Sequence, residues 1–198
     1  MDVLFYPHEE YNEFTFWGFD EPGIFSKLCG VVRASGLNVL GARITTRKDG
    51  RILDVFYVNK LGQSVREGEE VWDKLRDNLN KVLTGKKDVE ELVAKKRQEQ
   101  PIYSKAIPQY PTRIMVDNES SDAATVIDVI TYDRAGLLYD ITKTIKNLDL
   151  SIEYAKISTK VDQVVDAFYV VDMNHKKITD PERIEDIKTA LQESITAG

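Results

Sequence analysis

Two short turns in this chain carry residues whose types and spacing could bind a small charged ligand. Each turn joins an expected strand to an expected helix, where free backbone N–H groups and a partial positive charge favour a carboxylate. A glycine there lets a ligand approach the backbone, and an aspartate can accept hydrogen bonds from an ammonium group. The residues concerned are Asp20, Gly23 and Ile24 in the first turn and Asp133, Gly136 and Leu137 in the second.

Two polar residues at the start of the following strands complete these candidate sites. They are Asn38 after the first helix and Ser151 after the second. A purely structural interpretation stays open beside the functional one. Asp20 and Asp133 are natural helix caps, the glycines suit turns that bind nothing, and Asn38 suits a turn as well.

Other residues that could do chemistry favour structural roles. Cys29 lies among apolar residues of an expected helix and is predicted to be a small core residue. His8 and His175 have no neighbours at metal-ligand spacing, so we expect no metal site and no cofactor. Asp54 and Asp166 lie in apolar strands, where a hydrogen bond in a turn or at an edge is favoured over ligand contact. No nucleophile, base and orienting group converge in the sequence, so we expect no catalytic residues.

Composition narrows the class of partner. Hydrophobic residues make up 42% of the chain, charged residues make up 30%, and the net charge is −6. These values suit a globular protein and disfavour nonspecific nucleic-acid binding. No apolar run reaches the ~20 residues of a membrane span, and the first ten residues, MDVLFYPHEE, do not form a signal peptide. The expected compartment is the cytoplasm.

An internal repeat determines the domain organisation. Residues 20–58 return as residues 133–170, beginning with Asp20 and Asp133, and the match is expected to hold its register without a gap. Such a repeat indicates two copies of one domain. We therefore predict a first domain over residues 1–84, a linker over residues 85–111 and a second domain over residues 112–198.

The hydrophobic periodicity predicts the same elements in both copies. Residues 12–19, 37–46 and 52–58 read as strands, with helices after residues 23 and 68. Residues 125–132, 151–159 and 164–171 are the corresponding strands of the second copy, with helices after residues 136 and 180. Each copy is a βαββα repeat preceded by an additional strand. The fold class is therefore α+β, with antiparallel sheets, helices on one face and a ferredoxin-like order. Which sheet the additional strands join stays open.

The motifs in these elements resemble the ACT domain, a small amino-acid-sensing module. They are DEPG at residues 20–23 and DRAG at 133–136, then GLNV at 36–39, ARITT at 42–46 and DVFYV at 54–58. The segments VDN at 116–118, TVI at 125–127, DRAGLLY at 133–139, DAFYV at 166–170 and VLTG at 82–85 narrow the resemblance. They look like the C-terminal ACT pair of the bacterial PII uridylyltransferase/uridylyl-removing enzymes. Plant multi-ACT proteins share much of the second-copy pattern.

This resemblance implies a regulatory role in nitrogen metabolism. In that family the ACT pair reads glutamine and balances the addition of UMP to a PII signalling protein against its removal. The family's catalytic motifs, a Gly-Ser motif with paired acids and His-Asp metal ligands, do not occur here. We therefore expect the sensor part of such an enzyme, which acts with catalytic domains and the PII protein but is not itself catalytic.

The resemblance also bears on the ligand site. In amino-acid-binding ACT domains, residues matching Asp20 and Asn38 contact the ligand. Ala135 replaces the usual proline of the motif, and Ser151 replaces the asparagine of the first copy, which disfavours an equivalent second site. We expect the copies to pack side by side with the ligand between them.

Several alternatives stay open. A stand-alone tandem ACT protein could sense another amino acid or act through a protein partner. Pairing of an edge strand could produce a homodimer. A ferredoxin-like RNA binder is disfavoured, because the Phe-Tyr pairs lack basic neighbours.

Overall fold

The computed structural model describes residues 2–4, 10–47, 49–98, 111–134, 136–160 and 163–196. The first copy contains β1 (Asp2–Leu4), β2 (Asn12–Phe19), α1 (Ile24–Ser35), β3 (Asn38–Arg43), β4 (Arg51–Asn59) and α2 (Glu70–Leu83). The second contains β5 (Arg113–Asp117), β6 (Thr125–Tyr132), α4 (Leu137–Asn147), β7 (Leu150–Lys160), β8 (Gln163–Asp172) and α5 (Pro181–Thr196). The predicted α+β class and element order are confirmed.

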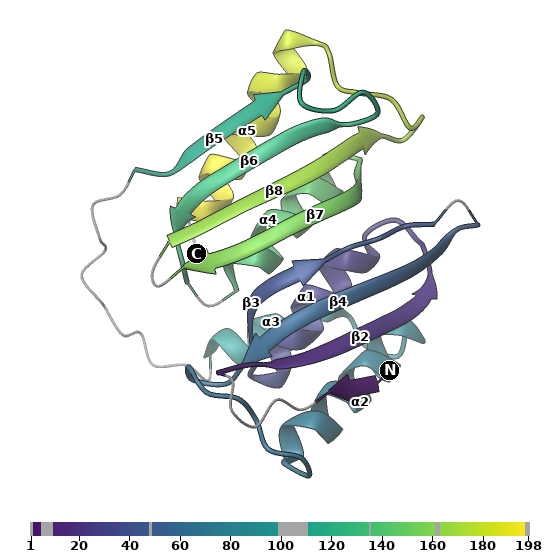
Figure 1. Cartoon of the computed structure of the whole chain (residues 1–198), viewed down its shortest axis with the longest axis vertical. Coiled ribbons are helices and arrows are strands. Elements are labelled where there is room, and N and C mark those ends of the chain that lie inside the picture. Colours follow the sequence, from purple (N-terminus) through teal and green to yellow (C-terminus); the bar gives the residue numbers. More distant parts are fainter. Residues whose placement is uncertain are drawn as a thin grey trace.

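The strands of both copies form one continuous antiparallel sheet. Within the described residues it has eight strands in the order β1-β2-β4-β3-β7-β8-β6-β5 (Figure 1). The leading strand of each copy therefore pairs within its own copy: β1 lies beside β2, and β5 lies beside β6. It occupies the edge that a fourth strand fills in a ferredoxin-like unit, which resolves the alternative left open by the sequence.

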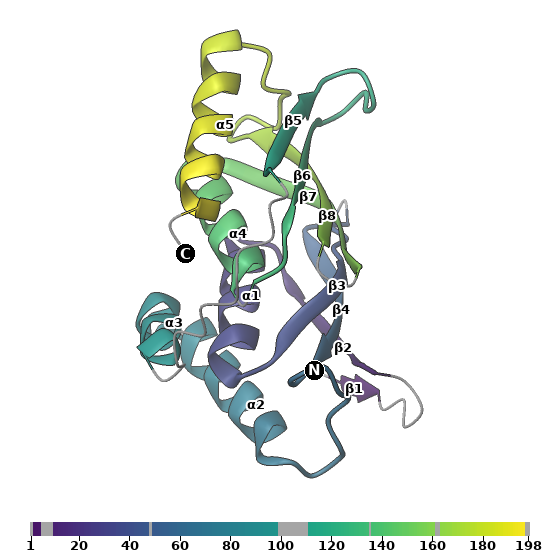
Figure 2. The same ribbon diagram turned by 90° about the vertical axis from the view of Figure 1, so that its left-hand side faces the viewer.

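The copies join through β3 and β7. These strands pair antiparallel, with Gly41 opposite Ser158, Ala42 opposite Ile157 and Arg43 opposite Lys156. The helices all lie on one side of the sheet, and its other face is open (Figure 2). Because the helix-facing residues alternate along each strand, the two copies share one apolar core, with Phe14, Phe56 and Phe168 almost fully buried.

The repeat register is not gapless, which corrects one expectation from the sequence. The offset between copies is 133 − 20 = 113 residues at the turns but 166 − 54 = 112 residues in the last strands. One residue is missing from the second copy between Ser158 and Asp166. The loss falls in the hairpin connection, where a length change costs little, and the buried faces of β4 and β8 stay equivalent.

The predicted linker contains a packed helix. Helix α3 (Val89–Gln98) follows α2 and buries Val93, which is only 2% exposed. It also carries ion pairs to the second copy, from Glu90 to Lys143 at 3.0 Å and from Arg97 to Asp140. The part of the predicted linker at residues 99–110 lies outside the described residues. Helix α3 thus contacts both α1 of the first copy and α4 of the second copy.

No helix among the described residues combines the length and apolarity that crossing a bilayer requires.

Candidate functional site

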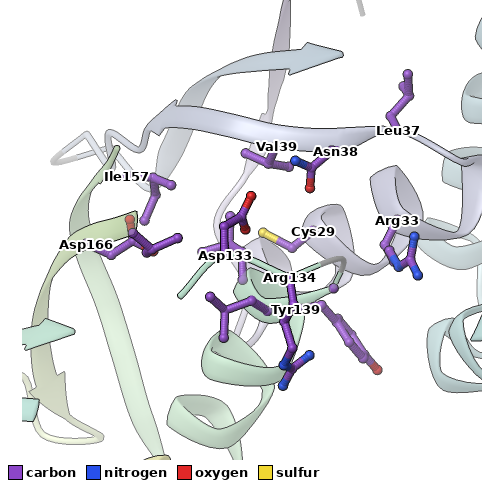
Figure 3. A pocket seen from close by; sticks show the side chains of 14 residues that line it. Cys29, Arg33, Leu37, Asn38, Val39, Asp133, Arg134, Tyr139, Ile157 and Asp166 are labelled. Carbon is purple, nitrogen blue, oxygen red and sulfur yellow. The ribbon is translucent and has the colours of Figure 1, made fainter. Parts of the chain in front are cut away.

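Two hollows lie where the copies meet, and each combines residues from both copies. The first, called the Asn38 hollow, brings Asn38 of β3 against Asp133, Gly136 and Leu137 of the second copy (Figure 3). Counted with the space open to solvent, its volume is about 410 Å³. Only about 20 Å³ of this space is enclosed, so the hollow is a shallow depression that is largely open to solvent.

The second hollow, called the Ser151 hollow, is its counterpart across the pseudo-twofold axis. Here Ser151 of β7 faces Asp20, Gly23 and Ile24 of the first copy, around a space of about 310 Å³. All eight predicted site residues therefore line the seam between the copies. The pairing is crossed, since the turn of one copy faces the strand start of the other. Asp20 and Asn38 consequently belong to different hollows.

The crossing follows from the sheet. Antiparallel pairing of β3 with β7 places α1 and α4 side by side, so that the start of each helix lies near the end of the other. Each strand start follows directly after one of these helix ends. The sequence identified the candidate residues within each copy. It did not show which residues of the other copy would lie opposite them.

The glycines in the two turns begin helices directly. Gly23 (φ 78°) and Gly136 (φ 89°) are the N-cap residues of α1 and α4, in a left-handed conformation that favours glycine. Neither helix start has a side-chain capping hydrogen bond. Gly23 and Gly136, and not Asp20 and Asp133, are therefore the N-cap residues. The first N–H of each helix donates to a carbonyl of its own turn, from Ile24 to Glu21 at 3.0 Å and from Leu137 to Arg134 at 3.1 Å.

A basic side chain from the other copy lies over each glycine. A Cβ atom added to Gly23 would lie 2.8 Å from the Lys146 side chain, and one added to Gly136 would lie 3.3 Å from Nε of Arg33. These two basic residues occupy equivalent positions, since 146 − 33 = 113. A cation is unfavourable beside the positive end of a helix dipole. An anion that contacts both the helix start and the cation would offset this repulsion.

The Asn38 hollow also contains ionisable groups that the sequence did not single out as site residues. Burial raises the pKa of Asp166 to about 7, the Ser158 N–H lowers it and the Asp133 charge raises it further. That N–H donates to Asp166 Oδ1 at 3.0 Å, as expected for a hairpin hydrogen bond. Burial, with Arg97 and Arg134 nearby, lowers the pKa of Arg33, and Asp140 opposes this. Both signs of charge therefore lie around one small space.

The Ser151 hollow has a different balance of charge. Burial, followed by the charge of Glu153, raises the pKa of Asp20, and the Glu21 N–H opposes this shift. Glu153 contacts His175 at 3.3 Å between Oε1 and Nδ1. The two hollows are thus related in backbone position but not in side-chain chemistry.

Cys29 contributes apolar surface to the Asn38 hollow. It is buried and unpaired with another cysteine, and burial raises the pKa of its thiol. The prediction of a core cysteine is confirmed. No group of three or more histidine, cysteine and acidic side chains in the described part of the chain could hold a metal ion.

Comparison with known proteins assigns the fold. Residues 113–198 match the family described as "ACR9-like, ACT-like domain". The second copy is an ACT-like domain. The first copy repeats its element order around the seam, so the chain is a pair of ACT-like domains.

The relatives of this ACT-like pair are larger enzymes. The bifunctional uridylyltransferase/uridylyl-removing enzyme of Rhodospirillum rubrum is 35% identical over 196 residues, which cover 99% of this chain and 21% of that protein. Its counterparts in Azospirillum brasilense and Cereibacter sphaeroides are 37% and 38% identical over 91% and 90% of the chain and 19% of each relative. The predicted resemblance to this enzyme family is confirmed. The ACT-like pair spans about a fifth of the length of these relatives.

Proposed function

We propose that this ACT-like pair is a glutamine sensor that regulates a PII uridylyltransferase/uridylyl-removing enzyme. The observation that carries the proposal is the Asn38 hollow, which joins the start of helix α4, a cation, an amide and carboxylates across the seam. Its chemistry matches the groups of an α-amino acid with a polar side chain. The relatives' name suggests catalytic domains as one partner, and the motif resemblance implies the PII protein as another.

Each group of glutamine has a complementary partner in this hollow. The N–H groups at the start of α4 and the Arg33 guanidinium favour the ligand carboxylate. Asp133 is placed to accept hydrogen bonds from the ligand ammonium group. Asn38 offers both a donor and an acceptor to the side-chain amide, and Asp166 can donate or accept because its pKa is about 7. Glutamate would place a second negative charge near these acids and should bind less well.

Calorimetric titration of the purified chain with glutamine tests this proposal, with glutamate, serine and leucine as comparison ligands. We expect glutamine-selective binding that Asn38→Ala weakens by about tenfold, because a lost pair of hydrogen bonds costs about 1.5 kcal/mol. Ser151→Ala is the matched control in the other hollow. An unchanged affinity in Asn38→Ala would place the site elsewhere.

Other outcomes separate the alternatives. Equal losses in Asn38→Ala and Ser151→Ala would indicate two equivalent sites. Selective binding of another of the four amino acids would favour a sensor of a different ligand. No heat with any of them at millimolar concentration would refute glutamine sensing by this chain and favour action through a protein partner.

A further inference from the structure

A third hollow lies on the helical side of the molecule, away from the sheet. It is formed by the start of α1, the loop between α2 and α3, and one face of α4, and its volume is about 780 Å³ counted with open space. It has no counterpart across the seam within the described residues, because α3 follows the first copy alone. We call it the lysine hollow.

The lining of this hollow carries an excess of positive charge. It contains four lysines and two acids, namely Lys27, Lys87, Lys143, Lys146, Asp88 and Glu90. Lys143 pairs with Glu90 at 3.0 Å, and Lys27 pairs with Glu21, outside the lining, at 2.5 Å. Asp88 accepts the Glu90 N–H at 2.6 Å and so caps α3. With Glu21 counted, the excess is 4 − 3 = 1 positive charge, in a chain whose net charge is −6.

The backbone adds to this positive potential. Gly23, the N-cap of the 12-residue helix α1, lies in the lining, and no side chain caps that helix start. The positive end of the helix dipole and the lysine excess therefore act in the same direction. A helix start of this kind suits an anion with several oxygens.

A buried hydroxyl provides an independent indication of a ligand. Tyr139 contributes to the lining and is only 4% exposed, yet its hydroxyl has no hydrogen-bond partner among the described residues. In Figure 3 the ring turns this hydroxyl away from Asn38 and Asp133. Burial, followed by the Glu90 charge, raises the pKa of Tyr139 well above its usual value. The hydroxyl stays protonated and is a buried donor without an acceptor in the described residues, on a side chain that lines both the lysine hollow and the Asn38 hollow.

We propose that the lysine hollow binds a small molecule that carries phosphate groups. Lysine ammonium groups bind phosphate oxygens as compact point charges on a movable side chain, and the start of a helix suits the same group. A phosphate group there would pair with Lys87 and Lys146, contact the start of α1 and accept a hydrogen bond from Tyr139.

Calorimetric titration of the whole chain with inorganic pyrophosphate tests the proposal. We expect binding that weakens with added salt. Lys87→Gln and Lys143→Gln should each lower the affinity about threefold, and the double variant about tenfold. Lys74→Gln on the exposed face of α2 is the matched control and should bind as the native chain does. Circular dichroism melting verifies that every variant is folded.

Three results would overturn the proposal. They are the absence of heat at 10 mM pyrophosphate, equal affinity in the native chain and the double variant, or an equal loss in Lys74→Gln. Tyr139→Phe distinguishes the hydrogen bond of the hydroxyl from the electrostatic contribution of the lysines. This variant should weaken binding several-fold without changing the salt dependence of the affinity. Lys87 lies in neither the Asn38 hollow nor the Ser151 hollow, so glutamine binding should persist in Lys87→Gln. The two proposals can therefore fail independently.

Discussion

The buried aspartates Asp54 and Asp166 should make the stability of the fold fall as the pH rises through neutrality. They occupy equivalent positions in β4 and β8 and are 0% and 2% exposed. Each accepts one N–H across its hairpin, from Thr45 at 3.3 Å and from Ser158 at 3.0 Å. The second oxygen of Asp54 is buried without a hydrogen-bond partner in the described residues. Burial raises the pKa of both carboxyls from 3.8 to about 7.

The sign follows from proton binding. Between pH 3.8 and about 7 the folded state holds a proton at each aspartate that the unfolded state has released. A rise in pH therefore favours unfolding in this window. From pH 5 to pH 8 each carboxyl should lower the free energy of unfolding by about 2.5 kcal/mol, or about 5 kcal/mol for both. That is a large part of the stability of an ordinary domain.

Urea unfolding of the native chain and Asp54→Asn at pH 5, 6, 7 and 8 measures this effect. The asparagine cannot ionise, so the variant should lose about 2.5 kcal/mol less than the native chain over that range. Asp54 is preferred to Asp166 because it lines neither seam hollow. Asp128→Asn in β6, whose pKa is raised less, serves as a control. Parallel pH profiles for the native chain and Asp54→Asn would refute the burial argument.

Three further substitutions test other parts of the structure. Gly136→Ala should lower the free energy of unfolding by about 1 kcal/mol, because an alanine is strained at φ 89°, and should abolish glutamine binding; unchanged calorimetry would contradict the assignment of the helix start. Arg134→Ala should cost about 2 kcal/mol in chemical denaturation, since it removes the 2.7 Å pair with Asp140 and the bonds to the Ser194 and Ile195 carbonyls; a cost below about 0.5 kcal/mol would show that these contacts are weak. Val93→Asp should detach α3 and increase amide exchange in that helix; unchanged protection would show that α3 is held by its ion pairs alone.

The hydrophobic periodicity of the sequence was sufficient to predict the helices and strands of both copies, because buried residues recur at regular intervals along each of them. Ile24, Leu28, Val31 and Val32 recur on one side of α1, and all four are buried. Helix α3 was harder to assign, since Val93 is its only buried residue within a charged sequence. Its packing depends on Gly30 of α1, where a Cβ atom would lie 2.4 Å from Val89. Such a contact between distant segments leaves no periodic pattern.

The candidate site shows a related limit. Local motifs identified eight of the residues that line the two hollows, because a helix start and a strand start each have a characteristic sequence. Their grouping into two hollows depended on the pairing of β3 with β7. The sequence of an edge strand does not indicate which other strand it will pair with. Arg33 and Tyr139 were missed for the same reason, since helical periodicity places them among core residues. The 113-residue repeat was the available signal, because it relates Arg33 to Lys146.

The continuous sheet determines which elements a ligand in the Asn38 hollow would displace. The β3–β7 pairing holds the strands of the two copies in register, so rotation of the copies within the sheet would break backbone hydrogen bonds. The helical layer is less constrained, because α1, α3 and α4 meet through side chains and ion pairs. A ligand between the start of α4 and the end of α1 would therefore act mainly on the spacing of these helices. Helix α3 contacts both, so it is the element whose position such a ligand would change, provided that the ligand binds one spacing more tightly than the other.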